Sequence, residues 1–217
     1  MKFLLPTSFL ASLLVFVSFI PAKQIPAAST TISPLADYSA EWNDPKYLKC
    51  NTAANVSYLS AEEKKTIYVL NMIRMNPVLF GKTVMQQYPD KGGHGVFRNS
   101  SFYKSLIQTL QKTQPMELLY ADSLCFKSAL CHAQTTGKDG TVTHDRTTEE
   151  CKKQLYFRAE CCHYGYNTAL DILVSLLVDE GVPSLGHRES LLGAYQKLGV
   201  SIQPHKKYGN TAVLDFH

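Results

Sequence analysis

The stretch from Val178 to Leu192, VDEGVPSLGHRESLL, constrains the fold most because it joins the end of one helix to the start of another. The residues before it, 170–178, are rich in Leu, Ile and Val and predict a helix, which Gly181 and Pro183 end abruptly. The chain then approaches a second short helix, with His187 close to its first turn. A histidine on a turn between packed helices can reach solvent, which suits catalysis or metal binding better than a core role.

The amino-terminus has the pattern of a secretory signal. Met1 and Lys2 supply a small positive region, residues 3–20 are apolar, and small residues follow. We therefore expect residues 1–22 to be a cleaved signal peptide, so that no membrane span remains after cleavage. An uncleaved membrane anchor is the alternative, because the apolar run is close to the length that crosses a bilayer.

Composition and length place one domain after the signal. Residues 23–49 are rich in Pro, Ala, Ser and Thr without helical or strand periodicity, which predicts a linker. The chain of 217 residues then has room for one sizeable domain over residues 50–217. The net charge is +4, but the basic residues are scattered rather than clustered, so nucleic acid is not the expected partner.

The cysteines of an exported chain predict disulfides, and six cysteines allow fifteen complete pairings, among which the sequence does not choose. If Cys125 and Cys131 share one helix, their separation of six residues puts them on different faces. The adjacent Cys161 and Cys162 can hardly bond to each other without strain. We therefore expect no bond within either of these two pairs. The six are Cys50, Cys125, Cys131, Cys151, Cys161 and Cys162.

Local signals predict more helix than strand. Ser60 and Glu63 have the spacing of a capping box, and Pro77 opens a second short helical pattern. A longer helix is predicted over about 120–137, with Leu124 and Ala129 available for burial. Helices are also predicted over 101–112 and 170–178, with a strand within 156–166 and a final hairpin of strands at 198–202 and 211–216. The pattern favours an α+β domain with an antiparallel sheet.

Four residues alternate imidazole and carboxylate, and each lies on a predicted loop, turn or element end: His144, Glu160, Asp179 and His187. Two histidines and two acids can bind zinc or another divalent cation, or can perform general acid/base catalysis. Spacing alone is a weak signal, because the sequence has neither HExxH nor paired CxxC. His132, inside a predicted helix, is expected to be structural rather than a ligand.

Several short segments, taken in order, resemble the CAP superfamily of secreted domains in its bacterial form. Residues 71–74 with Pro77 resemble the opening helix of the family, and residues 124–133 resemble its second long helix. His144 follows that helix, residues 158–160 resemble the segment with the first acid, and residues 186–192, GHRESLL, resemble the bacterial GHR motif. The resemblance covers nearly all of residues 60–216.

This resemblance implies a three-layer α-β-α sandwich with a small antiparallel sheet and a cleft lined by His144, Glu160, Asp179 and His187. The two histidines would be the metal ligands and would face each other, with the acids between them. The chain departs from the family pattern after Glu160, where two cysteines replace the usual Asn. Glu180 is an alternative second acid, and Asp179 is preferred because it lies nearer the end of the helix.

These expectations leave three classes of function open. The first is a secreted or cell-envelope domain that binds a divalent metal and a lipid, glycan or peptide ligand. The second is a hydrolase, for example a protease, in which a metal or an acid/base pair activates water. The third is a structural or interaction module of the cell envelope. No serine or cysteine lies in a recognisable nucleophile setting, so the sequence does not decide whether the protein is an enzyme.

Overall fold

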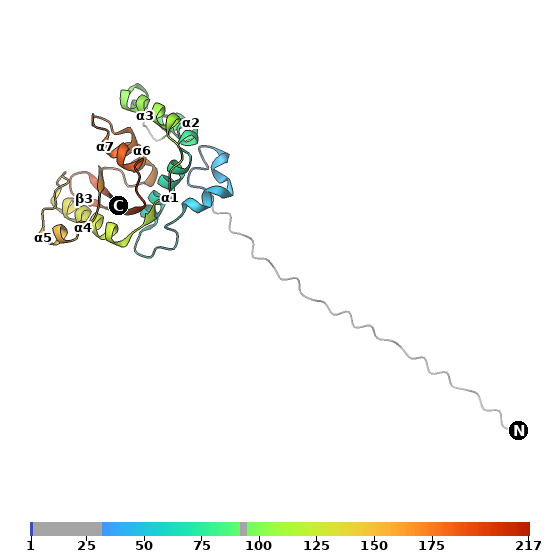
Figure 1. Cartoon of the computed structure of the whole chain (residues 1–217), viewed down its shortest axis with the longest axis horizontal. Helices are drawn as coiled ribbons and strands as arrows, with labels where there is room; N and C mark the ends of the chain where they lie inside the picture. Colours follow the sequence, from blue (N-terminus) through green and yellow to red (C-terminus); the bar gives the residue numbers. More distant parts are fainter. Residues whose placement is uncertain (2–31, 92–94) are drawn as a thin grey trace. The chain divides into compact units, whose positions relative to one another are not determined.

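The computed structural model describes Met1, residues 32–91 and residues 95–217 (Figure 1). Apart from Met1, the predicted signal peptide and residues 23–31 of the predicted linker lie outside the described residues. Residues 32–217 form one compact unit. None of the helices within the described residues has the length and apolar character needed to cross a membrane.

Residues 32–49, which were expected to belong to a linker, are packed against the core. They contain the 3-10 helix η1, Ala40–Asn43, and lead into η2, Pro45–Cys50, each capped by an acidic or hydroxyl side chain. Leu35, Trp42 and Tyr47 are buried. Their irregular spacing gives no helical or strand period, because 3-10 turns rather than a long element place them, so sequence periodicity does not reveal the packing.

Four strands form one sheet in the order β1-β3-β4-β2. β3 (Lys197–His205) pairs antiparallel with β4 (Gly209–Phe216), and β4 pairs antiparallel with β2 (Ala159–Tyr164). The short β1 (Tyr120–Ala121) pairs parallel with β3, so the sheet is antiparallel except at this edge. β2 occupies the other edge, which becomes important for the site.

Helices cover both faces of this sheet, which confirms the predicted α+β class and the α-β-α layers. On one face, α4 (Ser123–Asp139) packs on β3 and β4 through a small cluster that includes Ala129, Cys162 and Val213. On the other face lie the large core, α1 (Ala61–Met75), α6 (Ala169–Val178) and α7 (Gly186–Leu191). The remaining helices are α2 (Pro77–Gln87), η3 (Tyr88–Asp90), η4 (Gly95–Asn99), α3 (Ser101–Lys112) and α5 (Glu149–Lys153).

Local capping signals set several of these boundaries. Ser60 and Glu63 form the predicted capping box at the start of α1, with hydrogen bonds of 3.3 and 2.7 Å. Pro77 begins α2 as expected. The prediction is wrong at the start of α4, because Asp122 caps that helix and leaves Leu124 outside the core with 49% of its surface exposed.

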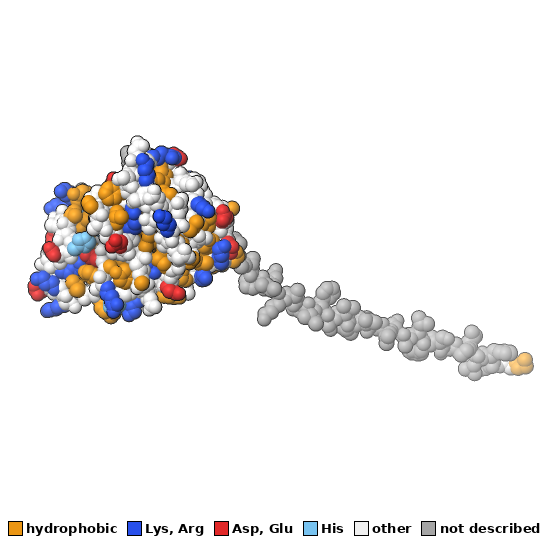
Figure 2. All heavy atoms as spheres, turned by 45° about the horizontal axis from the view of Figure 1, so that its top comes forward, with side chains coloured by type: hydrophobic (Ala, Val, Ile, Leu, Met, Phe, Trp, Pro, Cys, Tyr) orange, Lys and Arg blue, Asp and Glu red, His pale blue; other side chains and the backbone are white. Residues whose placement is uncertain are grey.

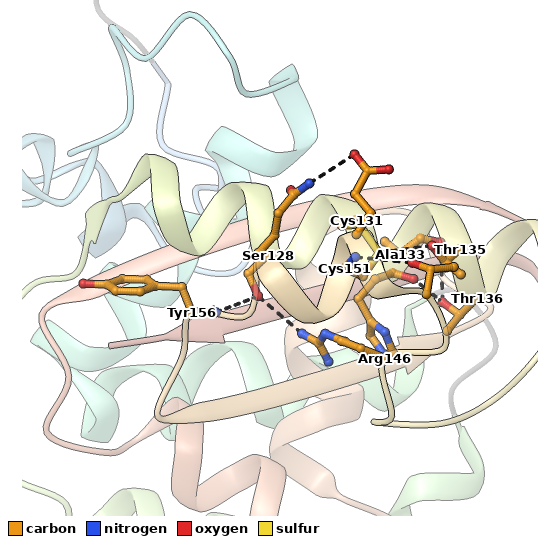
Figure 3. Close-up of a disulfide and its surroundings, with 12 residues drawn as sticks. Ser128, Cys131, Ala133, Thr135, Thr136, Arg146, Cys151 and Tyr156 are labelled. Carbon is orange, nitrogen blue, oxygen red and sulfur yellow. Dashed lines mark hydrogen bonds between the residues drawn. A yellow bond between two sulfur atoms is a disulfide. The ribbon is translucent and has the colours of Figure 1, made fainter.

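One disulfide, Cys131–Cys151, joins α4 to α5 (Figure 3). The other four cysteines are buried free thiols. As expected, Cys125 is not bonded to Cys131, and Cys161 is not bonded to Cys162. The disulfide closes a loop of sequence separation 20 that contains residue 144. On the face shown in Figure 2, basic and acidic side chains are interspersed.

Candidate functional site

The candidate site lies at the edge strand β2, where loops from the two helical layers meet. His144 is in the loop between α4 and α5, and Glu160 is on β2. Asp179 is the carboxyl-terminal cap of α6, and His187 is in the first turn of α7, on the opposite layer. The structure brings all four predicted residues together: the His144 and His187 rings are stacked, with centroids 6.3 Å apart and an interplanar angle of 29°.

His144 and Glu160 form the first histidine–acid pair, with Nδ1 2.9 Å from Oε1. The His144 side chain is 59% exposed, whereas that of Glu160 is only 3% exposed. Burial favours the protonated form of Glu160, but hydrogen bonds from His144 and Arg146 outweigh it and lower its pKa to about 2. The same hydrogen bond to Glu160 raises the pKa of His144. The ionised acid accepts the hydrogen bond, so the proton of the neutral imidazole lies on Nδ1.

The buried Arg146 guanidinium contacts the Glu160 carboxylate of this pair. Arg146 lies 2.5 Å from Oε2 of Glu160 and 3.4 Å from Oδ2 of Asp215. It is also close to Ser128, whose hydroxyl in turn accepts from the backbone of Tyr156 (Figure 3). Burial and the nearby charge of Glu160 raise the pKa of Asp215 to about 9, so this acid holds its proton at neutral pH.

Neither Arg146 nor Asp215 was identified as a site residue from the sequence. One signal could have identified Asp215: it is an acid inside the apolar run of the last strand. A charged residue that faces a core needs a polar partner, so its position predicts a buried polar contact. In β4, Asp215 is directly opposite Glu160 of β2 in the strand register. The sequence alone does not give this register, and so it does not show the two acids side by side.

His187 and Asp179 form the second pair, with Nδ1 2.7 Å from Oδ1. The other carboxylate oxygen accepts from the backbone N–H groups of His187 and Arg188, at 3.0 and 3.4 Å. Asp179 adopts a left-handed conformation with φ 57°, which acidic residues tolerate better than β-branched ones. The adjacent Glu180 instead contacts Ser100, so the structure places the preferred acid, Asp179, at the histidine.

Buried arginines hold the turn that carries His187. Arg188 donates from Nε to the carbonyl of Leu177 at 2.6 Å and from Nη2 to the carbonyl of Val178 at 2.9 Å, which closes the end of α6. Arg74 donates to the carbonyls of Leu191 and Gly193 at 3.0 and 2.8 Å, which satisfies the end of α7. Both arginines therefore fix backbone geometry.

A second group of possible ligands lies next to the first pair. His132, Glu160 and Cys162 offer one ligand atom each, all within 4.8 Å of one another, and such a group could hold a metal ion. Nε2 of His132 is 2.8 Å from the carbonyl of Thr143, so this histidine also has the structural contact expected of it. Burial lowers the pKa of His132 and raises that of the Cys162 thiol.

Each carboxylate is hydrogen-bonded to Nδ1 of its own histidine and so orients that ring. In both pairs, Nε2 is the ring nitrogen left to bind a metal. The site is open at the surface, with the His187 side chain 22% exposed.

Comparisons with known proteins give little guidance. No protein-family model and no curated protein matches this chain. Among solved structures, an outer surface protein from Borrelia burgdorferi is similar at 22% sequence identity and a TM-score of 0.36. The match covers 46% of this chain and 77% of that chain.

Proposed function

We propose that this chain is a secreted CAP-type domain that holds a divalent cation, preferably zinc, between His144 and His187. In this proposal the cation takes part in binding a lipid, glycan or peptide ligand. The observation that carries the proposal is that two facing imidazoles are each bonded through Nδ1 to a separate carboxylate, at 2.9 and 2.7 Å. We call this pair of histidines the outer site.

A carboxylate on one ring nitrogen is the usual support of a metal-binding histidine. It fixes the tautomer, directs the free lone pair of the other nitrogen and raises its basicity. The two Nε2 atoms suit zinc, and water or ligand oxygens would complete its coordination. Two protein ligands leave open positions, which fits a cation that binds a ligand better than a closed structural site.

The CAP assignment and the export rest on separate support. The order of motifs from residue 71 to residue 216 is accompanied by the α-β-α layers that the resemblance implies. Export is supported by the signal-like amino-terminal sequence and by the Cys131–Cys151 disulfide, because such bonds persist mainly in oxidising compartments. The ligand classes share oxygen donors that could fill open positions on zinc.

Calorimetric titration with zinc tests the outer site. We expect the purified chain to bind zinc and the His187→Ala variant to bind it at least about tenfold more weakly, because it loses a ligand rather than a supporting contact. His217→Ala is the matched control, since it removes a partly buried histidine that stacks on Tyr156 and not on the site. Unchanged affinity in His187→Ala, or no binding by the wild-type chain, would overturn the proposal.

Hydrolysis is the second candidate, because an ionised buried acid orients His144 and raises its pKa, as in a general-base pair. A cation at the outer site would lower the pKa of a bound water. Cleavage of a peptide library, followed by mass spectrometry, tests this candidate against Glu160→Gln. Equal products from both proteins would exclude it. If the histidine variants lose thermal stability while metal and ligand binding stay unchanged, the site is structural.

A further inference from the structure

We propose that His132, Glu160 and Cys162 form a second metal site, with His144 as its fourth ligand. We call it the inner site. It would take zinc or a similar divalent cation that accepts thiolate, imidazole and carboxylate ligands together. This proposal does not rest on the outer site, because neither His132 nor Cys162 contributes to the pair of facing rings.

The first support is the convergence of ligand atoms. One atom from each of His132, Glu160 and Cys162 lies within 4.8 Å of the other two. His144 adds a fourth, because its Nδ1 is 2.9 Å from Glu160 Oε1 and 3.7 Å from Cys162 Sγ. Ligands of a tetrahedral zinc ion at ordinary bond lengths are roughly 3.3–3.8 Å apart. To enclose an ion, the ligand atoms of His132, Glu160 and Cys162 would have to draw together from within 4.8 Å of one another, and His144 would have to move toward His132.

The second support is that rigid elements and outer contacts hold these side chains. His132 is on α4, and Nε2 of its ring lies 2.8 Å from the carbonyl of Thr143. Glu160 and Cys162 alternate with Cys161 along β2 and therefore project from the same face of the strand. Oε2 of Glu160 is 2.5 Å from Arg146, which leaves Oε1 to bind an ion. Such supporting contacts are characteristic of metal sites.

The third support is incomplete hydrogen bonding in the buried polar cluster around Glu160. Oδ1 of Asp215, which is opposite Glu160 in the strand register, is buried without a hydrogen-bond partner among the described residues. Buried polar atoms without a partner are uncommon in native proteins, and a bound ion or water often satisfies them. The Cys162 thiolate and the Glu160 carboxylate would supply two negative charges to a divalent cation, and Asp215 could ionise to balance the buried Arg146 cation.

His144 is the exposed member of the inner site, since its side chain is 59% exposed while that of Glu160 is 3% exposed. Binding would replace the His144–Glu160 hydrogen bond by two bonds to the ion, the Nδ1 proton of His144 would move to Nε2, and the Cys162 thiol would release its proton to solvent. Because His144 would then bind through Nδ1 and carry its proton on Nε2, it could not serve as a ligand of the outer site at the same time. Each site nevertheless keeps a ligand of its own, His187 for the outer and Cys162 for the inner.

Cobalt(II) distinguishes the two sites because only a thiolate ligand gives sulfur-to-cobalt charge-transfer absorption in the near ultraviolet. We expect the wild-type chain, titrated under argon without reductant so that the disulfide stays intact, to develop this band. It should disappear in Cys162→Ser and in His132→Gln, and persist in His187→Ala. Cys161→Ser is the matched control, since it removes the neighbouring free thiol on the opposite face of β2.

X-ray absorption covers inner-site variants that fail to fold, because it needs no substitution of an inner ligand. With one equivalent of zinc bound to the His187→Ala chain, which lacks the outer ligand, it should show a sulfur ligand at about 2.3 Å as well as nitrogen or oxygen at about 2.0–2.1 Å. Nitrogen and oxygen alone would overturn the inner site, as would a cobalt band that survives in Cys162→Ser or no band in wild type. Loss of zinc affinity in His187→Ala could still support the outer site in each of those cases.

Discussion

The two histidine–acid pairs meet at one site but are held in different ways. His144 and its acid rest on side chains, since Glu160 is braced by the buried Arg146 and Asp215. His187 and its acid rest on backbone, since Asp179 accepts from two backbone N–H groups at the start of α7. His144 is also inside a disulfide loop, whereas the turn that carries His187 is closed by arginine–carbonyl hydrogen bonds.

Because of this difference, the two halves of the site should respond differently to substitution. A cluster of buried side-chain charges depends strongly on each member, because removal of one leaves another charge unpaired in a dry environment. Backbone donors at a helix start are removed only by substitution to proline, so other substitutions in the second half remove the acceptor rather than these donors. We therefore expect the His144 half to respond more strongly to mutation and to pH than the His187 half.

The largest expected effect is that of Arg146→Met. The substitution leaves Glu160 and Asp215 buried without their cation, and breaking a buried ion pair in this way costs about 3–5 kcal/mol in the free energy of unfolding. Urea unfolding measures it. Arg98→Met is the control, because Arg98 pairs with Asp90 at the exposed surface and its loss should change stability little. Equal effects of the two substitutions would contradict the buried cluster.

The disulfide should have the next largest effect. Cys131→Ser with Cys151→Ser opens the loop that carries His144, and the loop-entropy relation for a sequence separation of 20 gives a loss of about 3 kcal/mol. Thermal and urea unfolding measure the loss. Cys125→Ser is the control for replacement of a cysteine by serine, because Cys125 is a buried free thiol on the same helix. No difference between the double variant and this control would contradict the prediction.

Much of the fold could be predicted because its signals are local. Ser60 with Glu63 caps α1, Pro77 starts α2, and the hydrophobic pattern at the carboxyl-terminus gives the β3–β4 hairpin. All four predicted site residues lie together, since each falls at a loop, turn or element end near the edge strand. The local signals for turns and caps thus located the loops that build the site.

The remaining features depend on contacts between distant segments. Trp42 and Tyr47 join the core through short 3-10 turns, whose sequence has no period to detect. Asp215 becomes the neighbour of Glu160 only through the β2–β4 register, and Arg146 reaches both only after the loop folds over them. Each acid also binds its own histidine, a choice that the order of residues along the chain does not fix.

A smaller effect is expected in the His187 half. Asp179→Asn keeps the size of the side chain, and asparagine also tolerates the left-handed conformation. Its NH2 group, however, would face an N–H donor of His187 or Arg188, which should lower the free energy of unfolding by about 1–3 kcal/mol. If the outer site holds zinc, the same change should weaken zinc affinity by about 10–100-fold. Glu180→Gln is the control, because its contact is with Ser100 near the surface, and its stability should stay within about 0.5 kcal/mol of wild type.

The subtlest test uses the pH dependence of stability in the presence of a chelator. Asp215 has a folded pKa raised to about 9 by burial and by Glu160, against about 3.9 for an unfolded aspartate. The native state therefore holds a proton that the unfolded chain releases above about pH 4, and this contribution to stability is lost as pH rises toward 9. Its slope is at most about 1.4 kcal/mol per pH unit.

Asp215→Asn should remove this slope between pH 5 and 8 and should therefore lose less stability than wild type as pH rises. Glu160 has the opposite sign: its folded pKa of about 2 lies below that of an unfolded glutamate, about 4.3, so its contribution is present above pH 4 and is lost as pH falls toward 2. Glu160→Gln should flatten that acid limb instead. If Asp215→Asn and wild type keep parallel stability profiles from pH 5 to 8, then Asp215 is not protonated in the native state, and the two acids beneath His144 are ionised together.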